Sequence, residues 1–442
     1  MKLKPMNQTF GNQQIAGVNA FQASMTIGLI GHVAHGKSSL VKALTGIETS
    51  RFKQEKERNS TIKLGYADAK IYQCSKCPRP VCFQSYRASQ EEPVKCEICG
   101  EPSLELVRYI SFVDCPGHDN FMATMLNGGA VMDAAILLVA ANESFPQPQT
   151  SEHLVVMELL GIHNVLVIQN KIDLVPDKEK LVQQQEQIRQ YLKGTVAQNS
   201  PIIPVSTQFR LNTDVVCEYL ANNFKQPDRE VQLPPRMSIV RSFDVNKPGC
   251  DPLQMKGGII GGKVTQGCLK KDDLLEVRPG LISRDENGYV VAYRPIPTKV
   301  TSISSGNGLA VPGGLVGIGT TLDPKVTQGD RLVGNIAGAP GSLPEVFNKM
   351  NVSFKLLKHL HGNESNEKIG KIKEGETLLV HFGSQCSTCR VYQTTKGKMS
   401  IHLKQAMCLD VGSRLTISRR IGSSWRLIGV GQITAGQTVP IF

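Results

Sequence analysis

The sequence lacks the features that mark membrane, secreted and repetitive proteins. Its longest apolar run, Ala134–Ala141, is far too short to span a bilayer and predicts a buried strand. Met1–Ser24 has no apolar central stretch, so we expect a loose, flexible tail rather than a secretory signal. The sequence contains no convincing internal repeat. We therefore expect a cytoplasmic protein that does not engage membranes, in which the 12 cysteines are thiols or metal ligands rather than disulfides.

The composition is that of a packed globular protein with a basic excess. Hydrophobic residues make up 40% and charged residues 20% of the 442 residues, which argues against a disordered chain and allows about two to four domains. The formal net charge is +12, and Phe347–Phe442 alone holds 14 Lys and Arg against 5 Asp and Glu. A polyanionic partner such as nucleic acid fits this balance, although basic proteins without such a partner are common.

A complete phosphate-binding loop pattern, Gly31-x4-Gly36-Lys37-Ser38, follows a predicted strand and opens a predicted helix. Backbone N–H groups of such a loop and of the helix N-terminus converge on phosphate oxygens. Lys37 supplies a point charge to the β- and γ-phosphates, and Ser38 offers its hydroxyl to Mg²⁺. The residues expected to contact the phosphates here are Gly31, Ala34, His35, Gly36, Lys37, Ser38 and Ser39.

Three later motifs follow apolar strands and together select GTP over ATP. Asp114–His118 offers the Asp114 carboxylate to Mg²⁺ and the Gly117 backbone N–H to the γ-phosphate. In Asn170-Lys171-Ile172-Asp173, the Asp carboxylate can accept two hydrogen bonds that guanine offers and adenine does not, while the Lys covers the base. A backbone N–H within Ser206-Thr207-Gln208 can reach the guanine O6. The order of the motifs places the ligand at the carboxyl ends of the strands, as in open α/β sheets.

Magnesium coordination needs one more residue from the segment between the loop and Asp114. Thr61 lies in that window, within Arg58–Lys63. A threonine there completes the Mg²⁺ coordination and senses the γ-phosphate. Taken alone it is an ordinary loop threonine, and its position between the two motifs is what favours the metal role.

The first half of the chain alternates strands and helices, which predicts a mostly parallel sheet with helices on both faces. The expected strands are Thr26–Ile30, Tyr109–Asp114, Ala134–Ala140, Asn164–Gln169 and Ile202–Val205. The expected helices are Lys37–Leu44, Ser151–Leu160, Lys178–Tyr191 and Thr213–Phe224.

The second half has a different pattern. Prolines between Gln226 and Pro235 predict a stiff linker. After it, short β-branched runs alternate with glycine turns, which is typical of small all-β barrels. A long helical pattern occurs there at Glu345–Lys358, and a second break at Gly338–Gly341 indicates two barrels.

Two Cys-x2-Cys pairs, Cys74 with Cys77 and Cys96 with Cys99, are separated by 18 residues. Four thiolates at this spacing suit a tetrahedral, structural Zn²⁺ that staples a loop with little apolar content, and free thiols are the alternative. A catalytic zinc is not expected, because it needs an open position. Three further cysteines are expected to be free thiols, the last two of them in a turn: Cys82, Cys386 and Cys389.

The sequence resembles the gamma subunit of eukaryotic and archaeal translation initiation factor two, a translational GTPase, over nearly its whole length. The cysteine insertion is similar to the zinc-binding knuckle of that family, which elongation factors that carry tRNA generally lack. The stretches that carry the resemblance are Ala34–Ser38, Ile62–Tyr66, Asp114–His118, Pro146–Leu154, Arg241–Gly249, Ser418–Arg420 and Trp425–Gly429.

The resemblance implies an α/β P-loop GTPase domain followed by two all-β barrel domains. The expected divisions are a flexible tail at 1–24, a GTP-binding domain at 25–233 with the zinc-knuckle insertion at 74–99, a barrel at 237–341 and a basic barrel at 342–442. It further implies GTP or GDP, Mg²⁺ and structural Zn²⁺ as bound groups. Asn59 and Tyr66 are placed by the resemblance near a pocket for the aminoacylated end of tRNA.

The implied function is translation initiation. In the GTP-bound state, members of this family deliver methionyl initiator tRNA to the small ribosomal subunit and release it after hydrolysis. The implied partners are alpha and beta subunits of the same factor, with GTPase-activating and nucleotide-exchange factors. Two alternatives stay open: an elongation-type GTPase that carries a specialised aminoacyl-tRNA, such as selenocysteinyl-tRNA, and a GTPase scaffold that no longer cycles.

Three positions depart from the family pattern. Ala34 stands where archaeal members carry Asp, which argues against a second metal ion at the phosphates. Ser60 stands where Ile usually precedes the switch threonine, and Thr207 replaces the usual Ala. His118 is expected to orient the attacking water, and no arginine is placed in a motif as a finger in cis. We therefore expect hydrolysis that is slow without an activating protein.

Overall fold

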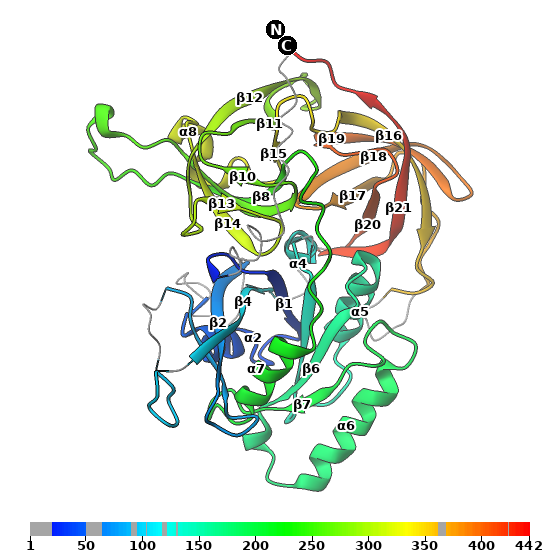
Figure 1. Cartoon of the computed structure of the whole chain (residues 1–442). Coiled ribbons are helices and arrows are strands. Elements are labelled where there is room, and N and C mark those ends of the chain that lie inside the picture. Colours follow the sequence, from blue (N-terminus) through cyan, green and yellow to red (C-terminus); the bar gives the residue numbers. More distant parts are fainter. Residues whose placement is uncertain are drawn as a thin grey trace. The chain divides into compact units, whose positions relative to one another are not determined.

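The chain forms two compact units, shown as a computed structural model in Figure 1. The structure describes residues 20–49, 64–89, 95–102, 104–116, 122–129, 131–360, 368–422 and 424–442. The sheet unit is built from Ala23–Pro227, and the barrel unit from Asp228–His359 and Lys368–Phe442.

A seven-stranded sheet forms the centre of the sheet unit, in the order β3-β2-β4-β1-β5-β6-β7. The strands from β4 to β7 in this order run parallel, whereas β2 is antiparallel to β4 and β3 is antiparallel to β2. The prediction of a mostly parallel sheet is therefore confirmed. The strand bounds are β1 Met25–Gly31, β2 Gly65–Cys74, β3 Phe83–Arg87, β4 Leu104–Asp114, β5 Ala134–Ala140, β6 Asn164–Asn170 and β7 Ile202–Pro204.

Helices cover both faces of this sheet (Figure 1). On one face Leu40 and Leu44 of α2 and Leu220 of α7 pack against Ile27 and Phe112 in one hydrophobic core. On the other face α5 contacts β1. The helix bounds are α2 Lys37–Thr45, α4 Met122–Gly129, α5 Pro148–Leu160, the 3-10 turn η3 Ile172–Leu174, α6 Lys178–Leu192 and α7 Thr213–Asn222.

The ends of the helices follow from local sequence. Pro148 begins α5, where a missing N–H costs nothing, and Gly161 ends it in the left-handed conformation. The carboxylate of Asp177 caps α6 by accepting a hydrogen bond from the backbone N–H of Glu179. The starts of α5 and α6 fix where the loops at the carboxyl edge of the sheet end.

The barrel unit contains two closed barrels of six strands each, in the orders β11-β12-β14-β9-β8-β15 and β16-β19-β18-β17-β20-β21. The first has β8 Arg236–Phe243, β9 Ile259–Gln266, β11 Leu274–Arg284, β12 Val290–Ile303, β14 Leu315–Thr320 and β15 Ile336–Gly338. The second has β16 Val346–Leu356, β17 Thr377–Phe382, β18 Gln385–Thr395, β19 Lys398–Cys408, β20 Arg414–Ile421 and β21 Ser424–Thr438. Shorter elements of the first barrel are η4 Pro252–Gln254, β10 Leu269–Lys270, β13 Leu309–Ala310, α8 Pro324–Thr327 and η5 Gln328–Asp330.

The two barrels share a hydrophobic cluster, so they belong to one unit. Tyr293 of the first barrel and Cys408 of the second are both buried in it. Arg278 donates hydrogen bonds to the carbonyl oxygens of Leu343 and Pro344 at 2.9 and 3.1 Å, which ties the connecting segment to the first barrel. Arg236 forms an ion pair with Asp410 at 2.9 Å.

Two local predictions for the second barrel were wrong. The expected helix at Glu345–Lys358 is the strand β16, which pairs with β19 on one side and β21 on the other. Two ladders of backbone hydrogen bonds outweigh the helical spacing of its apolar residues. The expected turn at Cys386 and Cys389 lies inside β18, where residues three apart point to opposite faces, so Cys386 is exposed and Cys389 buried.

The described end of the expected tail is held in place. Gln22 is buried, and its side-chain amide donates to the carbonyl of Val311 at 2.7 Å and accepts from the Val311 N–H at 3.0 Å. Across the described residues, every helix is too short or too polar to traverse a lipid bilayer.

Candidate nucleotide site and metal centre

The phosphate loop connects β1 to α2 and owes its shape to two glycines. Gly31 has φ 136° and Gly36 has φ 95°, which is the left-handed region that favours glycine. A Cβ on Gly36 would lie 2.2 Å from the side-chain nitrogen of Asn170, so no larger residue fits there. Ala34 also has positive φ, at 61°, and its side chain is exposed, as is that of Ser39. The loop therefore presents its backbone at the carboxyl edge of the sheet.

Lys37 is folded onto this loop. Its ammonium group donates to the carbonyl oxygens of Gly31 at 2.8 Å and His32 at 2.6 Å, and only 6% of the residue is exposed. Burial lowers the pKa of Lys37 to about 8, against the raising effect of the Asp114 carboxylate. A bound phosphate would offer this cation an anionic partner in place of two neutral carbonyls.

Two of the three residues expected to hold Mg²⁺ lie side by side. Ser38 donates its hydroxyl to Asp114 at 2.6 Å, and Asp114 is fully buried. Thr49 donates to the same carboxylate oxygen, also at 2.6 Å, although no motif in the sequence marks it. Hydroxyl and carboxylate oxygens are the ligands that Mg²⁺ prefers, so these residues fit the ion. Four other predicted residues lie outside the described part of the chain: Asn59, Thr61, Gly117 and His118.

Asn170 joins three of the predicted segments. Its amide nitrogen donates to the carbonyl of His35 in the phosphate loop at 2.9 Å, and its amide oxygen accepts from the backbone N–H of Thr207 at 3.2 Å. Lys171 has φ 62° and turns the chain into η3, where Asp173 is exposed. The Thr207 N–H, expected to reach a guanine, is thus bonded to Asn170. Ser206 is fully buried and Gln208 is exposed.

Helix α5 supports the start of the phosphate loop. His153 accepts a hydrogen bond from the backbone N–H of Gly31 at 3.1 Å, in a buried position. Gln149, one turn earlier, contacts the ring of His32. Both residues belong to Pro146–Leu154, one of the stretches that carry the family resemblance. In the structure this stretch holds the start of the phosphate loop in place.

A carboxylate that no motif marks lies between two of these loops. Glu143 is 3.2 Å from the ring of His35 and 3.7 Å from the ammonium group of Lys171. Burial lowers the pKa of His35 to about 4, while Glu143 acts to raise it. Sequence reasoning missed Glu143 because its role depends on partners more than 25 residues away on either side.

The four predicted cysteine ligands are gathered at one place. The sulfur atoms of Cys74, Cys77, Cys96 and Cys99 all lie within 4.8 Å of one another, with Cys74 to Cys99 at 3.6 Å and Cys77 to Cys96 at 3.7 Å. Four sulfur donors at this spacing fit a tetrahedral Zn²⁺. Cys82 is buried outside the cluster, as expected.

Polar groups beside the cluster favour the thiolate form of Cys96, whereas burial raises the pKa of the Cys77 thiol. Gln84 donates its side-chain N–H to the sulfur of Cys96 at 3.2 Å. Burial alone would raise the pKa of Cys96, but the backbone N–H groups of Cys99 and Ile98 and the Gln84 amide lower it to about 6. Tyr86 holds Gln84 in place through a 2.6 Å hydrogen bond. These donors stabilise negative charge on the sulfur of Cys96, the form in which a cysteine binds a metal ion.

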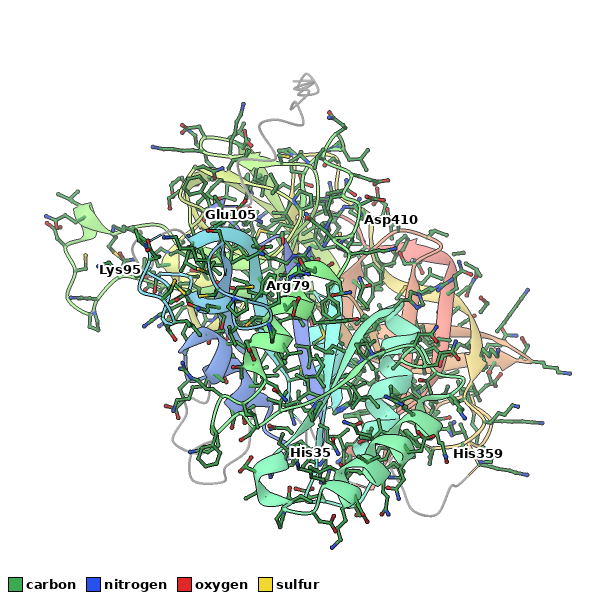
Figure 2. The ribbon with its side chains drawn as sticks, turned by 60° about the horizontal axis from the view of Figure 1, so that its bottom comes forward. His35, Arg79, Lys95, Glu105, His359 and Asp410 are labelled. Atoms are coloured by element: carbon green, nitrogen blue, oxygen red, sulfur yellow. The ribbon has the colours of Figure 1, made fainter. Side chains whose placement is uncertain are left out.

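The cysteine cluster and the phosphate loop lie at opposite ends of one strand. In the pairing of β2 with β4, Gly65 is opposite Asp114 and Cys74 is opposite Leu104. Since β4 has 11 residues, its ends are roughly 30 Å apart at about 3.3 Å per residue. Figure 2 shows His35 at one end of the sheet unit, and Lys95 and Glu105 toward the other. Tyr66 pairs with Val113 at the nucleotide end and is partly buried.

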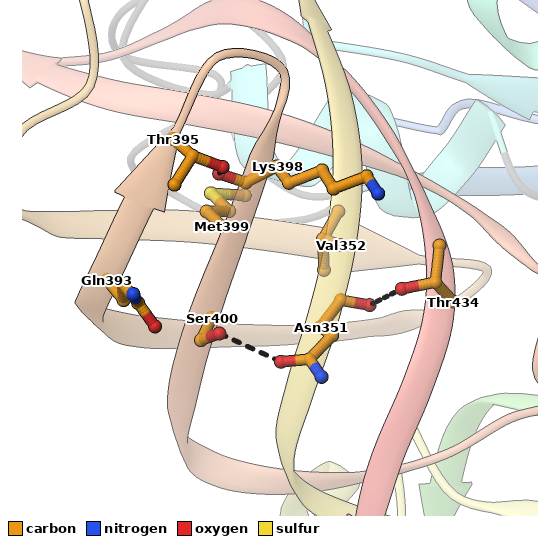
Figure 3. A pocket seen from close by; sticks show the side chains of 8 residues that line it. All are labelled: Asn351, Val352, Gln393, Thr395, Lys398, Met399, Ser400 and Thr434. Carbon is orange, nitrogen blue, oxygen red and sulfur yellow. Dashed lines mark hydrogen bonds between the residues drawn. The ribbon is translucent and has the colours of Figure 1, made fainter.

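The second barrel carries a separate pocket of about 310 Å³ (Figure 3). Ser400 donates to the side chain of Asn351 at 2.8 Å, and Thr434 donates to its carbonyl at 3.0 Å. Lys398 is the one charged residue in its lining. With a single cation and polar groups bonded to each other, this pocket does not match a nucleoside triphosphate.

Comparisons with known proteins agree with the geometry. Residues 22–226 match the family described as elongation factor Tu GTP binding domain, and residues 348–433 match initiation factor eIF2 gamma, C terminal. The chain is 46% identical over 430 residues to eukaryotic translation initiation factor 2 subunit gamma of Schizosaccharomyces pombe, covering 95% of this chain and 96% of that protein. It is 47% identical over 429 residues to eukaryotic translation initiation factor 2 subunit 3 of Drosophila melanogaster, covering 95% and 90%.

Two solved structures share the fold at low identity. A bacterial selenocysteine-specific elongation factor, EF-Sec, has a TM-score of 0.68 and 21% identity, covering 94% of this chain and 59% of that one. Elongation factor SelB from Methanococcus maripaludis, solved with the GTP analogue GppNHp, has a TM-score of 0.66 and 19% identity, covering 95% and 80%. These two structures therefore share the arrangement of the fold with this chain.

Proposed function

The chain belongs to the family of the gamma subunit of translation initiation factor two, and on that premise we propose that it carries methionyl initiator tRNA to the small ribosomal subunit while GTP is bound. Membership makes it a translation initiation GTPase. The elongation-type alternative is less supported, because the selenocysteine factors share only 19–21% of their sequence with the chain. Release of the tRNA after GTP hydrolysis completes the proposed cycle.

The observation that carries the proposal is the junction at Asn170, which ties the phosphate loop to the segment of Thr207. A ligand at this edge meets phosphate-binding and base-binding groups together. We assign the phosphates to Gly31, Ala34, His35, Gly36, Lys37, Ser38, Ser39 and Gly117. We assign the guanine to Asn170, Lys171, Asp173, Ser206, Thr207 and Gln208, and Mg²⁺ to Ser38, Thr61 and Asp114.

Hydrolysis is assigned to a water oriented by His118. Mg²⁺, when bound, neutralises charge that develops on the phosphates, and Lys37 adds a second positive charge. An arginine supplied by an activating protein is worth about 10³ to 10⁵ in rate, so turnover by the isolated chain is expected to be slow. Single-turnover hydrolysis with and without the activating protein measures this, and a His118→Ala variant that keeps full stimulated activity would remove the assignment.

Zinc in the cysteine cluster is proposed to be structural. All four ligand positions are taken by sulfur, so no position remains for a substrate. The cluster joins the end of β2 to the segment before β4, which holds the antiparallel edge of the sheet together.

A protein partner is supported by an exposed apolar loop on the first barrel. Leu253 is 94% exposed and Met255 47% exposed, although the loop itself is well ordered by hydrogen bonds from Asn246 to Asp244 and Lys256. A loop that offers apolar side chains to solvent is typical of a protein interface. We assign it to contact with another subunit of the factor, alpha or beta.

The carrier function is tested by binding of methionyl initiator tRNA in the presence of GDP or a non-hydrolysable GTP analogue. A nucleotide switch requires at least a tenfold difference in affinity, which corresponds to about 1.4 kcal/mol. Elongator methionyl-tRNA and selenocysteinyl-tRNA serve as controls. Equal affinity in the two nucleotide states, or preference for a control tRNA, would contradict the proposal.

A further inference from the structure

Glu143 occupies a position between the phosphate loop and the base-binding loop. One carboxylate oxygen lies 3.2 Å from the ring nitrogen of His35, and the other lies 3.7 Å from the ammonium group of Lys171. The Glu143 side chain is 30% exposed and that of Lys171 27% exposed, whereas that of His35 is 1% exposed. A single side chain therefore contacts both loops that a nucleotide would bridge.

The main chain of Glu143 is held from a third direction. Gln184 of α6 donates its side-chain amide to the carbonyl oxygens of Glu143 at 2.9 Å and Ala140 at 3.1 Å. Gln184 is itself oriented by Gln169, which donates to it at 2.8 Å in a buried position. Because these partners lie on β6 and α6, the main chain that carries the Glu143 carboxylate is held by regular elements as well as by its own loop.

His35 is the fixed point of the contact. Its other ring nitrogen lies 3.0 Å from the carbonyl oxygen of Leu138, and its own carbonyl accepts from Asn170 at 2.9 Å. The other charged or titratable groups that influence it are Lys37 and His32. Among Glu143, Lys37 and His32, Glu143 is the group with a negative charge. It therefore also attracts the ammonium group of Lys171 on the opposite loop.

We propose that Glu143 is a positioning residue that holds Lys171 against the phosphate loop, so that base and phosphate contacts act as one unit. Lys171, which we assign to cover the base, has φ 62° and a side chain that is 27% exposed, and without a partner it would sample many rotamers. The inference rests on the proposed nucleotide site. It goes beyond it by naming a residue outside every nucleotide motif.

The test is a double-mutant cycle on GDP release from the full chain. Glu143→Gln keeps the shape and removes the charge, and it should release GDP about two- to fivefold faster, as expected for a partly exposed ion pair. Lys171→Ala should release GDP at least as fast as Glu143→Gln, because it also removes the assigned contact with the base. Because both changes remove one interaction, Glu143→Gln in the Lys171→Ala background should add less than about 1.5-fold. Glu186→Gln, an exposed carboxylate on α6, is the matched control and should leave release unchanged.

A second readout separates positioning from general loosening of the fold. Binding of inorganic pyrophosphate, which has no base, should weaken much less in Glu143→Gln than binding of GDP. Glu143→Asp keeps the charge with a shorter reach and should fall between the wild type and Glu143→Gln. Equal loss of GDP and pyrophosphate affinity, fully additive effects with Lys171→Ala, or wild-type GDP release by Glu143→Gln would overturn the proposal. A wild-type chain that fails to bind GDP would instead overturn the nucleotide site itself.

Discussion

The two ends of β4 lie beside polar groups of different chemistry: oxygen and nitrogen groups at one end, and thiols at the other. At the Asp114 end, a buried carboxylate accepts hydrogen bonds from the hydroxyls of Ser38 and Thr49, and Lys37 donates to backbone carbonyls. At the other end, Leu104 pairs with Cys74, and the sulfur atoms of four cysteines lie close enough together to share one metal ion. Both ends belong to one sheet, yet one suits an exchangeable ligand and the other a permanent one.

The difference lies in what each group gains from its partner. Ser38, Thr49 and Lys37 form contacts that phosphate oxygens or Mg²⁺ can replace at little cost, because one polar partner substitutes for another. Four thiolates without a metal would repel one another, so that end is stable only when neutralised by a cation or by protons. The nucleotide end therefore tolerates cycles of binding and release, and the cysteine end does not.

The largest effect is expected at the cysteine end. Cys96→Ser should abolish binding of one Zn²⁺ per chain and destabilise the antiparallel edge by several kcal/mol, part of the total of about 10–16 kcal/mol seen for structural zinc in peptides. GDP affinity should change less than about twofold, because the nucleotide lies roughly 30 Å away. Metal analysis of protein purified under reducing conditions, thermal unfolding and GDP titration measure the three quantities.

Cys386→Ser is the control for the loss of a thiol, because Cys386 is exposed in the second barrel. A folded wild-type protein that contains no zinc would end the metal assignment. A large loss of GDP affinity in Cys96→Ser would show that the two ends are coupled.

The reverse pattern is expected at Asp114. Asp114→Asn removes the negative charge but keeps the shape, and loss of a buried charge that faces a metal ion costs about 2–5 kcal/mol, or about 30- to 4 × 10³-fold in affinity for Mg²⁺ and GTP. Glu105→Gln, an exposed carboxylate near the far end of the same strand, should have no effect. Titration of GTP at a fixed Mg²⁺ concentration measures the affinity of both variants. Unaltered affinity in Asp114→Asn would contradict the magnesium site.

Asp173 is expected to read the base. Asp173→Asn should weaken GTP by about 1–3 kcal/mol, the value of a bidentate contact to guanine. It should favour xanthosine triphosphate, because an amide can donate to the oxo group that replaces the guanine amino group. Both nucleotides are titrated against the variant, and an unchanged preference for GTP would exclude Asp173 from base recognition.

The smallest effect is a pH dependence that only the nucleotide end should show. Burial lowers the pKa of Lys37 to about 8, and phosphate binds the charged form. GDP affinity should be highest below pH 8. Above pH 8 it should fall by at most about tenfold per pH unit, because binding must then return a proton to the amine. Calorimetry at pH 9 in two buffers of different ionisation enthalpy should detect up to about one proton taken up.

The same experiment at pH 7 should detect almost no proton uptake. Lys37→Arg retains its charge at both pH values and should abolish the uptake wherever it still binds GDP. Proton uptake that is the same at pH 7 and pH 9 in the wild type would rule out Lys37 as the source.

Much of the sheet unit could be predicted because its signals are local. Strands such as Ala134–Ala140 are apolar throughout, since a parallel strand is buried on both faces. Helix α2 begins at the residue that the phosphate-loop pattern requires. The four-cysteine cluster also follows from spacing, because Cys-x2-Cys pairs bring their sulfurs together wherever the chain turns.

The amino-acid sequence by itself determined the alternating sheet, the nucleotide motifs and the metal-ligand set, because each depends on residues close together in the chain. Only the tertiary structure decided that Val346–Leu356 is a strand, since two neighbouring strands satisfy its backbone. It alone placed Thr49 on Asp114 and Glu143 between His35 and Lys171, because those contacts join residues from 28 to 108 positions apart. The residues of one motif lie close together in the sequence. The side chains that hold a motif in place come from distant elements that the fold brings beside it.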